Sequence, residues 1–227
     1  MWVDIPVDGG RMAGYLAKPA KPGPGLVMLQ EIFGVNDAMQ QKAKTFAGQG
    51  FTVLVPDLFW RQKPRVSLGY TEEGRKQGFG YMQKFDFAAG VRDIAAAARW
   101  LEGETKGKVG VIGFCLGGKL AVAATAAYPF AAVASFYGVK LDADPERLAA
   151  VQVPLQVHVG DKDAHVPMEA VERIKEILRE KPNAEVFVYP GAQHGFFNAA
   201  RAEVYARAAA AEAQKRTTAM FERALAA

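Results

Sequence analysis

The chain has 227 residues, of which 50% are hydrophobic and 23% are charged, as in globular proteins with one large core. Its formal charge is +4, but Lys and Arg are interspersed with acids, so no basic face for nucleic acid or for a membrane surface is predicted. A single cysteine excludes an intrachain disulfide and a zinc site built from several thiolates.

Short apolar runs alternate with amphipathic stretches along the chain. A turn at Asp8-Gly9-Gly10 predicts an N-terminal hairpin, and the apolar runs predict strands over residues 11–17, 26–30, 51–57, 108–114, 131–138, 153–160 and 184–190. Apolar residues spaced three and four apart predict helices over 37–49, 85–103, 116–127, 167–180 and 200–225. Residues 60–84, rich in Gly, Arg, Lys and aromatics, indicate a loop with short helical pieces.

Continuously apolar strands that alternate with helices are typical of an α/β fold with a mostly parallel central sheet and helices on both faces. No linker, repeat or low-complexity boundary interrupts the pattern, so we expect one domain over residues 1–227. In such sheets ligands bind outside the carboxyl ends of the strands. The residues directly after each strand are therefore the candidates for function.

A thiol, a carboxylate and an imidazole follow three of the predicted strands: Cys115, Asp163 and His194. This is the chain order of nucleophile, acid and base in hydrolases built on a doubly wound sheet. Asp161 competes for the acid role, although the spacing before Val166-Pro167 favours Asp163. The pattern predicts nucleophilic catalysis by Cys115, with His194 as base and an aspartate to orient it.

The sequence around Cys115 has the form G-x-C-x-G, from Gly113 to Gly117, which is the nucleophile-elbow pattern with sulfur in place of a serine oxygen. Such a turn puts the thiol at a helix N-terminus, where a thiolate is favoured. The N–H of Leu116 would then be free to bind an oxyanion. The second donor in this architecture comes from the loop after an earlier strand, which here is Ile32.

Further polar residues at strand ends have open interpretations. Glu31 lies beside the expected oxyanion loop and favours a functional role, whereas Asp57 favours a structural role in satisfying loop N–H groups. Tyr137 would either border the pocket or pack. His158, inside an apolar strand, is expected to be a core histidine, and His165 a loop residue near the site.

These residues together resemble the dienelactone hydrolase (carboxymethylenebutenolidase) family of the α/β-hydrolase fold, over nearly the whole chain. The resemblance rests on "QEIFGVN" at 30–36, "PDL" at 56–58, "GFCLGG" at 113–118, "YGV" at 137–139, "DAHVP" at 163–167 and "HGF" at 194–196. It implies a Cys115–Asp163–His194 triad. It also implies that Glu31 contacts the thiol and takes part in its activation when substrate binds.

The residues that would bind a substrate carboxylate depart from this resemblance. Arg75 fits the first of two expected arginines, but Phe79 replaces an expected tyrosine. Asn198 stands where the second arginine is expected, and Arg201 is a possible substitute. With Tyr137, these residues are the candidate substrate contacts, and the specificity for a carboxylated lactone is left open.

The resemblance implies a carboxylic ester hydrolase that opens a lactone or ester through an acyl-enzyme, without metal or organic cofactor. A carboxylesterase or thioesterase for another substrate, and a non-catalytic scaffold with a redox-sensitive thiol, are the alternatives. The N-terminus lacks a signal-peptide pattern and no apolar run approaches the ~20 residues that span a bilayer. We therefore expect a cytoplasmic protein, monomeric or weakly homo-oligomeric, whose partner is a small-molecule substrate.

Overall fold

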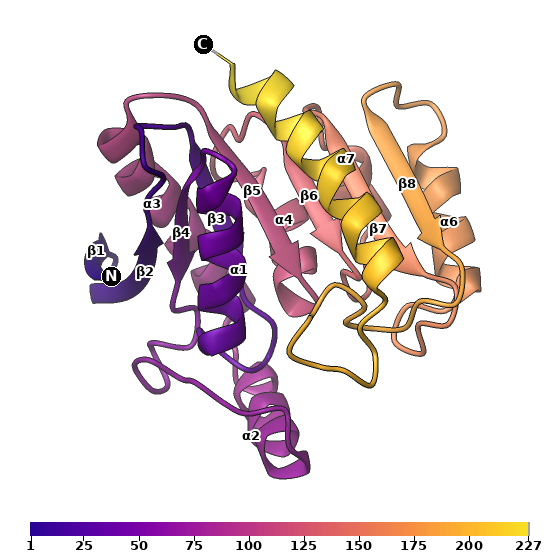
Figure 1. The fold of residues 1–227 in the computed structure, drawn as a ribbon, viewed down its shortest axis with the longest axis horizontal. Helices are drawn as coiled ribbons and strands as arrows, with labels where there is room; N and C mark the ends of the chain where they lie inside the picture. The colour runs from indigo at the N-terminus through magenta and orange to yellow at the C-terminus, as the bar shows by residue number, and fades with distance from the viewer. Residues whose placement is uncertain (227) are drawn as a thin grey trace.

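The computed structural model describes residues 1–226 and contains an eight-stranded sheet (Figure 1). The strand order is β1-β2-β4-β3-β5-β6-β7-β8. Strand β2 is antiparallel to both of its neighbours, β1 and β4, and all the other neighbouring strands are parallel. The strands are β1 (Trp2–Val7), β2 (Gly10–Ala17), β3 (Gly25–Leu29), β4 (Thr52–Pro56), β5 (Val109–Phe114), β6 (Val133–Phe136), β7 (Leu155–Gly160) and β8 (Ala184–Tyr189). The predicted hairpin and mostly parallel sheet are confirmed.

Helices cover both faces of the sheet, as predicted. Helices α1 (Asp37–Gly48) and α7 (Arg207–Leu225) lie on the face toward the viewer in Figure 1. On the opposite face lie α3 (Phe87–Thr105), α4 (Leu116–Ala124), α5 (Pro145–Ala149) and α6 (Met168–Leu178). No helix among residues 1–226 is long and apolar enough to cross a membrane.

The inner strands are buried along their whole length, which explains why they read as continuous apolar runs rather than as alternating patterns. Every residue of β3 to β7 is buried. Side chains that point to one face join α1 and α7 in a core around Phe46 and Phe221, and those that point to the other face pack with α3, α4 and α6 around Ile94 and Leu120. Two cores on one sheet leave the carboxyl edge of the strands free for a site.

Helix α2 (Glu72–Gln83) is the main difference from the predicted elements, since the sequence indicated a loop with only short helical pieces over residues 60–84. Its glycines lower helix propensity, but tertiary packing requires two of them. A Cβ on Gly78 would lie 2.6 Å from the Ile32 carbonyl oxygen, and one on Gly74 would clash with the Gly69 carbonyl oxygen. Thr71 caps the helix, and α2 projects past the carboxyl edge of the sheet (Figure 1).

Two smaller differences concern helix boundaries. Helix α7 begins at Arg207 rather than near residue 200, because residues 199–204 form turns that return the chain from the site. A short helix, α5, interrupts the predicted loop between β6 and β7. Asp144 caps α5, and Pro145 occupies its first turn, where a missing N–H costs nothing.

Candidate active site

Cys115 lies on a strained turn between β5 and α4. Its backbone has φ 57° and ψ −116°, a conformation that a non-glycine residue rarely adopts. A Cβ on Gly113 would clash with the Gly117 carbonyl oxygen, and one on Gly117 would lie 2.6 Å from the Gln30 carbonyl oxygen. Both glycines of the G-x-C-x-G pattern are therefore required by close backbone contacts, and the predicted elbow is present.

Two backbone N–H groups, in the elbow and in the loop after β3, are without a partner in the part of the chain that the structure describes. Cys115 is partly exposed and lies directly before the first turn of α4. Within residues 1–226, the N–H groups of Leu116 and Ile32 donate no hydrogen bond to the protein. These are the two amides that the sequence nominated for an oxyanion.

Asp163 orients His194. The His194 Nδ1 lies 2.9 Å from Asp163 Oδ2 and 3.1 Å from Oδ1. Asp163 is buried, and its Oδ1 also accepts hydrogen bonds from the N–H groups of His165 and Val166, at 2.8 and 3.0 Å. The competing carboxylate, Asp161, instead accepts from the Gly191 N–H at 2.6 Å. The structure thus pairs the histidine with Asp163 rather than with Asp161.

The surroundings of His194 favour its protonated form. Burial alone would lower its pKa, but the hydrogen bonds to Asp163 and the interaction with Cys115 outweigh burial and raise the pKa to about 10. The ring packs edge-on against Tyr137, with centroids 4.9 Å apart. At neutral pH, His194 therefore holds a proton beside the thiol.

Glu31 is held behind the site by two neutral donors. The Tyr137 hydroxyl donates to Glu31 Oε1 at 3.1 Å, and Asn198 Nδ2 donates to Oε2 at 3.2 Å. All three side chains are buried. In the described residues Glu31 makes no hydrogen bond to Cys115, in contrast to the direct contact with the thiol that the resemblance implies. Its carboxylate is instead fixed in place at the edge of the cavity.

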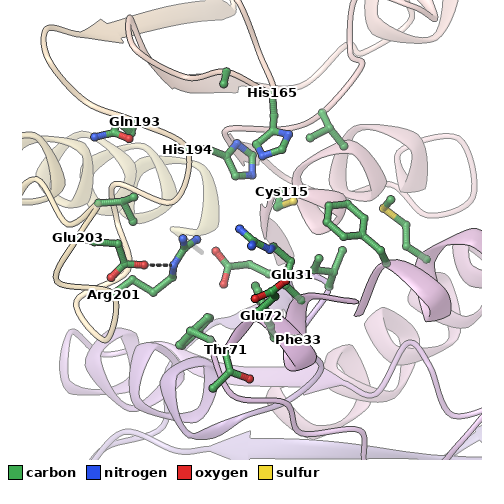
Figure 2. Close-up of a pocket in the computed structure, with 18 of the residues that line it drawn as sticks. Glu31, Phe33, Thr71, Glu72, Cys115, His165, Gln193, His194, Arg201 and Glu203 are labelled. Carbon is green, nitrogen blue, oxygen red and sulfur yellow. Dashed lines mark hydrogen bonds and ion pairs between the residues drawn. The ribbon is translucent and has the colours of Figure 1, made fainter. Parts of the chain in front are cut away.

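A cavity of about 540 Å³ opens over Cys115. Figure 2 shows Cys115, His194 and His165 grouped on one side of it and Arg201, paired with Glu203 at 3.0 Å, on the other. The lining combines cations, acids and apolar side chains, namely Arg75, Lys140, Lys162, Arg201, Glu31, Glu72, Glu203, Ile32, Phe33, Tyr70, Phe79, Met82, Val139 and Val204, with polar and small residues between them. The lining thus contains four Lys or Arg side chains and three acids, of which Arg201 and Glu203 pair with each other.

Both candidate arginines, Arg75 and Arg201, affect the pKa of His165. His165 packs edge-on against His194, with ring centroids 4.6 Å apart. Its pKa is lowered by burial first, and then by the positive charges of His194, Arg201 and Arg75, against the opposing effect of Asp163. Arg75 and Arg201 thus both line the cavity, and the charges of both reach His165.

Two of the candidate substrate contacts lie elsewhere. Tyr137 is fully buried and Asn198 is almost so, and neither lines the cavity. Both side chains are instead turned to Glu31, and for Tyr137 this agrees with the packing alternative. Arg75 and Phe79 do line the cavity, as expected. Sequence reasoning missed Lys162, although its position directly after β7 was a usable signal.

His158 and Asp57, which the sequence suggested to be structural residues, are both buried and hydrogen-bonded within the protein. His158 is fully buried and bonds Tyr189 Oη at 2.8 Å and Thr217 Oγ1 at 3.0 Å, and burial lowers its pKa to about 3. Asp57 is buried and accepts from the Arg65 N–H in the loop after β4. Within residues 1–226, no group of three or more His, Cys, Asp or Glu side chains is arranged to hold a metal ion.

A nucleophile elbow at the carboxyl edge of this sheet, with the histidine–aspartate pair on the loops after β8 and β7, defines an α/β-hydrolase. Comparison with known proteins narrows the class. The sequence model of the dienelactone hydrolase family matches residues 12–225, and the chain belongs to that family. It is a hydrolase of ester or lactone bonds, and its substrate is a small molecule.

Individual relatives agree with this assignment. A carboxymethylenebutenolidase of Pseudomonas putida is 35% identical over 92% of this chain and 90% of its own, and one of Cupriavidus pinatubonensis is 33% identical over 81% and 80%. The crystal structure of a Klebsiella pneumoniae protein, 26% identical, superposes with a TM-score of 0.87 over 98% of both chains. A dienelactone hydrolase-like phosphotriesterase from metagenomic libraries, 24% identical, shares the fold over 100% and 98% (TM-score 0.80).

Proposed function

We propose that the enzyme opens a carboxymethylenebutenolide-type lactone, or a related ester, through a thioester on Cys115. The observation that carries this proposal is the strained elbow thiol beside a histidine that Asp163 holds protonated. A thiolate next to an imidazolium is a ready nucleophile at neutral pH. The reaction then needs no metal or organic cofactor.

In the first half-reaction, the Cys115 thiolate attacks the carbonyl carbon and forms the C–S bond. The N–H groups of Leu116 and Ile32, which have no other partner in the described chain, would stabilise the oxyanion. As the carbonyl re-forms, the bond to the ring or ester oxygen breaks, and the His194 imidazolium gives that oxygen its proton. A thioester and a neutral histidine remain.

In the second half-reaction, the now neutral His194 takes a proton from water, and the hydroxide attacks the thioester carbon. The C–S bond breaks, the thiolate is released beside the imidazolium, and the product leaves as a carboxylic acid that ionises in solvent. Throughout, Asp163 accepts the Nδ1 proton of the ring in a hydrogen bond and keeps the ring oriented. The starting state is thereby restored.

We infer that the negative charge of Glu31 opposes thiolate formation in the resting enzyme. Tyr137 and Asn198 fix its carboxylate close to the cavity but keep it off the sulfur. In Glu31→Gln the same shape is kept and the charge is removed. Alkylation of Cys115 by iodoacetamide should then extend to lower pH than in the wild type, and identical pH profiles would contradict this role.

The substrate class follows from the cations and the apolar wall. Arg75 and Arg201 both line the cavity, and Phe79 and Met82 provide apolar surface. We propose that these arginines hold a substrate carboxylate, with Arg201 in place of the arginine expected at Asn198. Guanidinium groups bind carboxylates through paired hydrogen bonds, each worth about 1.5–3 kcal/mol.

The covalent step is tested by turnover of p-nitrophenyl acetate with wild type, Cys115→Ala and Cys115→Ser, and by mass spectrometry of the acetylated protein. Loss of turnover and of the acetyl adduct in Cys115→Ala is expected. Equal turnover in wild type and Cys115→Ala would refute catalysis by the thiol. It would favour the non-catalytic alternative.

The substrate class is tested separately with a carboxylated lactone and its neutral methyl ester. Arg75→Ala and Arg201→Ala should each lower kcat/KM for the carboxylated compound by about tenfold or more and leave the neutral one within about twofold. Arg179→Ala, an exposed arginine at the end of α6 that pairs with Glu176, is the matched control. Equal losses for both lactones would argue against the clamp and for a general carboxylesterase or thioesterase.

We further infer that the enzyme acts as a single domain, as a monomer or weak homo-oligomer in the cytoplasm. One chain supplies both cavity walls, from α2 on one side and the β8–α7 segment on the other. Light scattering across a range of concentrations checks the oligomeric state, and cell fractionation checks the compartment.

A further inference from the structure

A second cavity, of about 330 Å³, lies between α1, α7 and the segment 197–200. It shares no lining residue with the cavity over Cys115. The two helices lie side by side on one face of the sheet, and Gln214 of α7 donates to Gln49, at the end of α1, at 2.8 Å (Figure 1). We call this space the α1–α7 cavity.

A buried lysine lines the α1–α7 cavity without a counter-ion. Lys42 is only 8% exposed, and among the ion pairs and hydrogen bonds of residues 1–226 its ammonium has no partner. Its ammonium lies 5.4 Å from the centre of the Phe114 ring. Burial lowers its pKa, an effect that Glu31 opposes and Arg201 reinforces. A buried charge of this kind is costly unless an anion pairs with it.

Other features of the α1–α7 cavity also favour an anion. Arg207 adds a second cation, and the described lining contains no Asp or Glu. Helix α7 has 19 residues, but Ala206 offers no side-chain cap and no acid stands in the first turn. The unsatisfied N–H groups of that turn belong to residues around Arg207, at the cavity wall.

The remaining wall indicates what the rest of the ligand would be. Tyr205 and, to a smaller extent, Phe197 present aromatic surface, and Ala38 and Ala210 present small apolar groups. An inorganic anion without an apolar part would leave this apolar surface exposed to water. An organic anion with a flat apolar body would cover it and still reach the lysine.

We propose that the α1–α7 cavity is a second ligand site that binds organic carboxylates with an apolar body, with the carboxylate paired to Lys42. Hydrolysis of an ester or lactone releases a carboxylate, so the site suits the chemical class of the enzyme's own products. Asn198 forms part of the cavity wall and donates to Glu31. A ligand there would therefore lie one side chain away from the catalytic region.

Benzoate is the probe, and ¹H–¹⁵N NMR of enzyme alkylated at Cys115 with iodoacetamide is the measurement, so that catalysis does not enter. Saturable shifts in the millimolar range are expected for the amides of residues 38–46 and 207–211. Benzamide, which has the same shape without the charge, and inorganic phosphate, which lacks the apolar body, should bind at least about tenfold more weakly.

Two variants locate the binding. Lys42→Met keeps the chain length and removes a buried charge without a counter-ion, so it should fold, and it should weaken benzoate binding by about tenfold or more. Ala211→Trp, at an exposed position of α7 that lines the cavity, should block binding and leave Lys42 in place. Arg75→Ala should leave these shifts unchanged.

Three results would overturn the proposal. They are the absence of saturable shifts at 38–46 and 207–211, unchanged binding in Lys42→Met, and equal binding of benzoate and benzamide. Equal binding of phosphate would overturn the organic part of the ligand class. Each result is independent of whether Cys115 is the nucleophile.

Discussion

Asp163→Asn tests the central contact of the site with a minimal change. Asparagine keeps an Oδ1 that can accept from the N–H groups of His165 and Val166, so the loop should be retained. It replaces Oδ2, which lies 2.9 Å from His194 Nδ1, with an NH₂ group. Two donors would then face each other, and the ring would place its single proton on Nε2, toward the sulfur.

The magnitude follows from the protonation of His194. A rise in its pKa from 6.5 to about 10 corresponds to about 5 kcal/mol in favour of the imidazolium, in spite of burial. One charge-assisted hydrogen bond accounts for about 2–3 kcal/mol of this free energy. That bond alone corresponds to about 30- to 150-fold in rate. Because the substitution also favours the wrong tautomer of the ring, we expect kcat/KM to fall by about 10²–10⁴ at neutral pH.

The assay is the rate of Cys115 alkylation by iodoacetamide across pH, together with ester turnover. In the wild type, the imidazolium persists until the pH approaches about 10, and in Asp163→Asn this limit should move to lower pH. Asp161→Asn is the matched control, since its carboxylate bonds Gly191 instead of the histidine. A wild-type pH profile in Asp163→Asn would refute the reasoning.

Three further changes test the supporting structure. Gly117→Ala brings a methyl group within 2.6 Å of a backbone oxygen that follows β3, so the free energy of unfolding in urea should fall by about 3 kcal/mol or more. Tyr137→Phe removes a donor from the buried Glu31 carboxylate, and a loss of about 1–3 kcal/mol is expected in the same assay, with kcat lowered more than KM is raised. Burial raises the pKa of Asp57 to about 6, against opposing backbone hydrogen bonds, so its contribution to stability is full below about pH 4 and is lost as pH rises through 6. Asp57→Asn should thus gain about 2–3 kcal/mol relative to wild type between about pH 4 and pH 8, and a pH-independent difference would contradict this.

The position of the reactive residues could be predicted because parallel strands end at one edge. Cys115, Asp163 and His194 lie far apart in the chain, but each lies within about five residues of the end of a strand that is apolar in sequence. The turn at Cys115 could be predicted from the sequence as well. Backbone contacts at Gly113 and Gly117 leave no room for a side chain, so the turn requires glycine at both positions. In both cases a local pattern determines a local geometry.

The wall around Glu31 could not be predicted, because it depends on which way side chains turn. Tyr137 follows β6, a position typical of a residue that borders a pocket, yet its ring is fully buried and its hydroxyl points to Glu31. Helix α2 escaped prediction for a related reason. Its glycines reduce local helix propensity, and the contact of Gly78 with the Ile32 loop becomes visible only in the fold.

Lys42 is a charged residue on the buried face of helix α1. It lies on the α1 face that also carries Met39 and Phe46, a position where an apolar residue would normally stand. The resemblance predicts a cation at position 198, where the chain has a neutral asparagine that donates to Glu31. Lys42 lines the same cavity as Asn198 and is affected by the charge of Glu31. Position 198 thus carries no cation but an amide that donates to Glu31, and Arg201 is the nearby arginine in the chain that lines the substrate cavity.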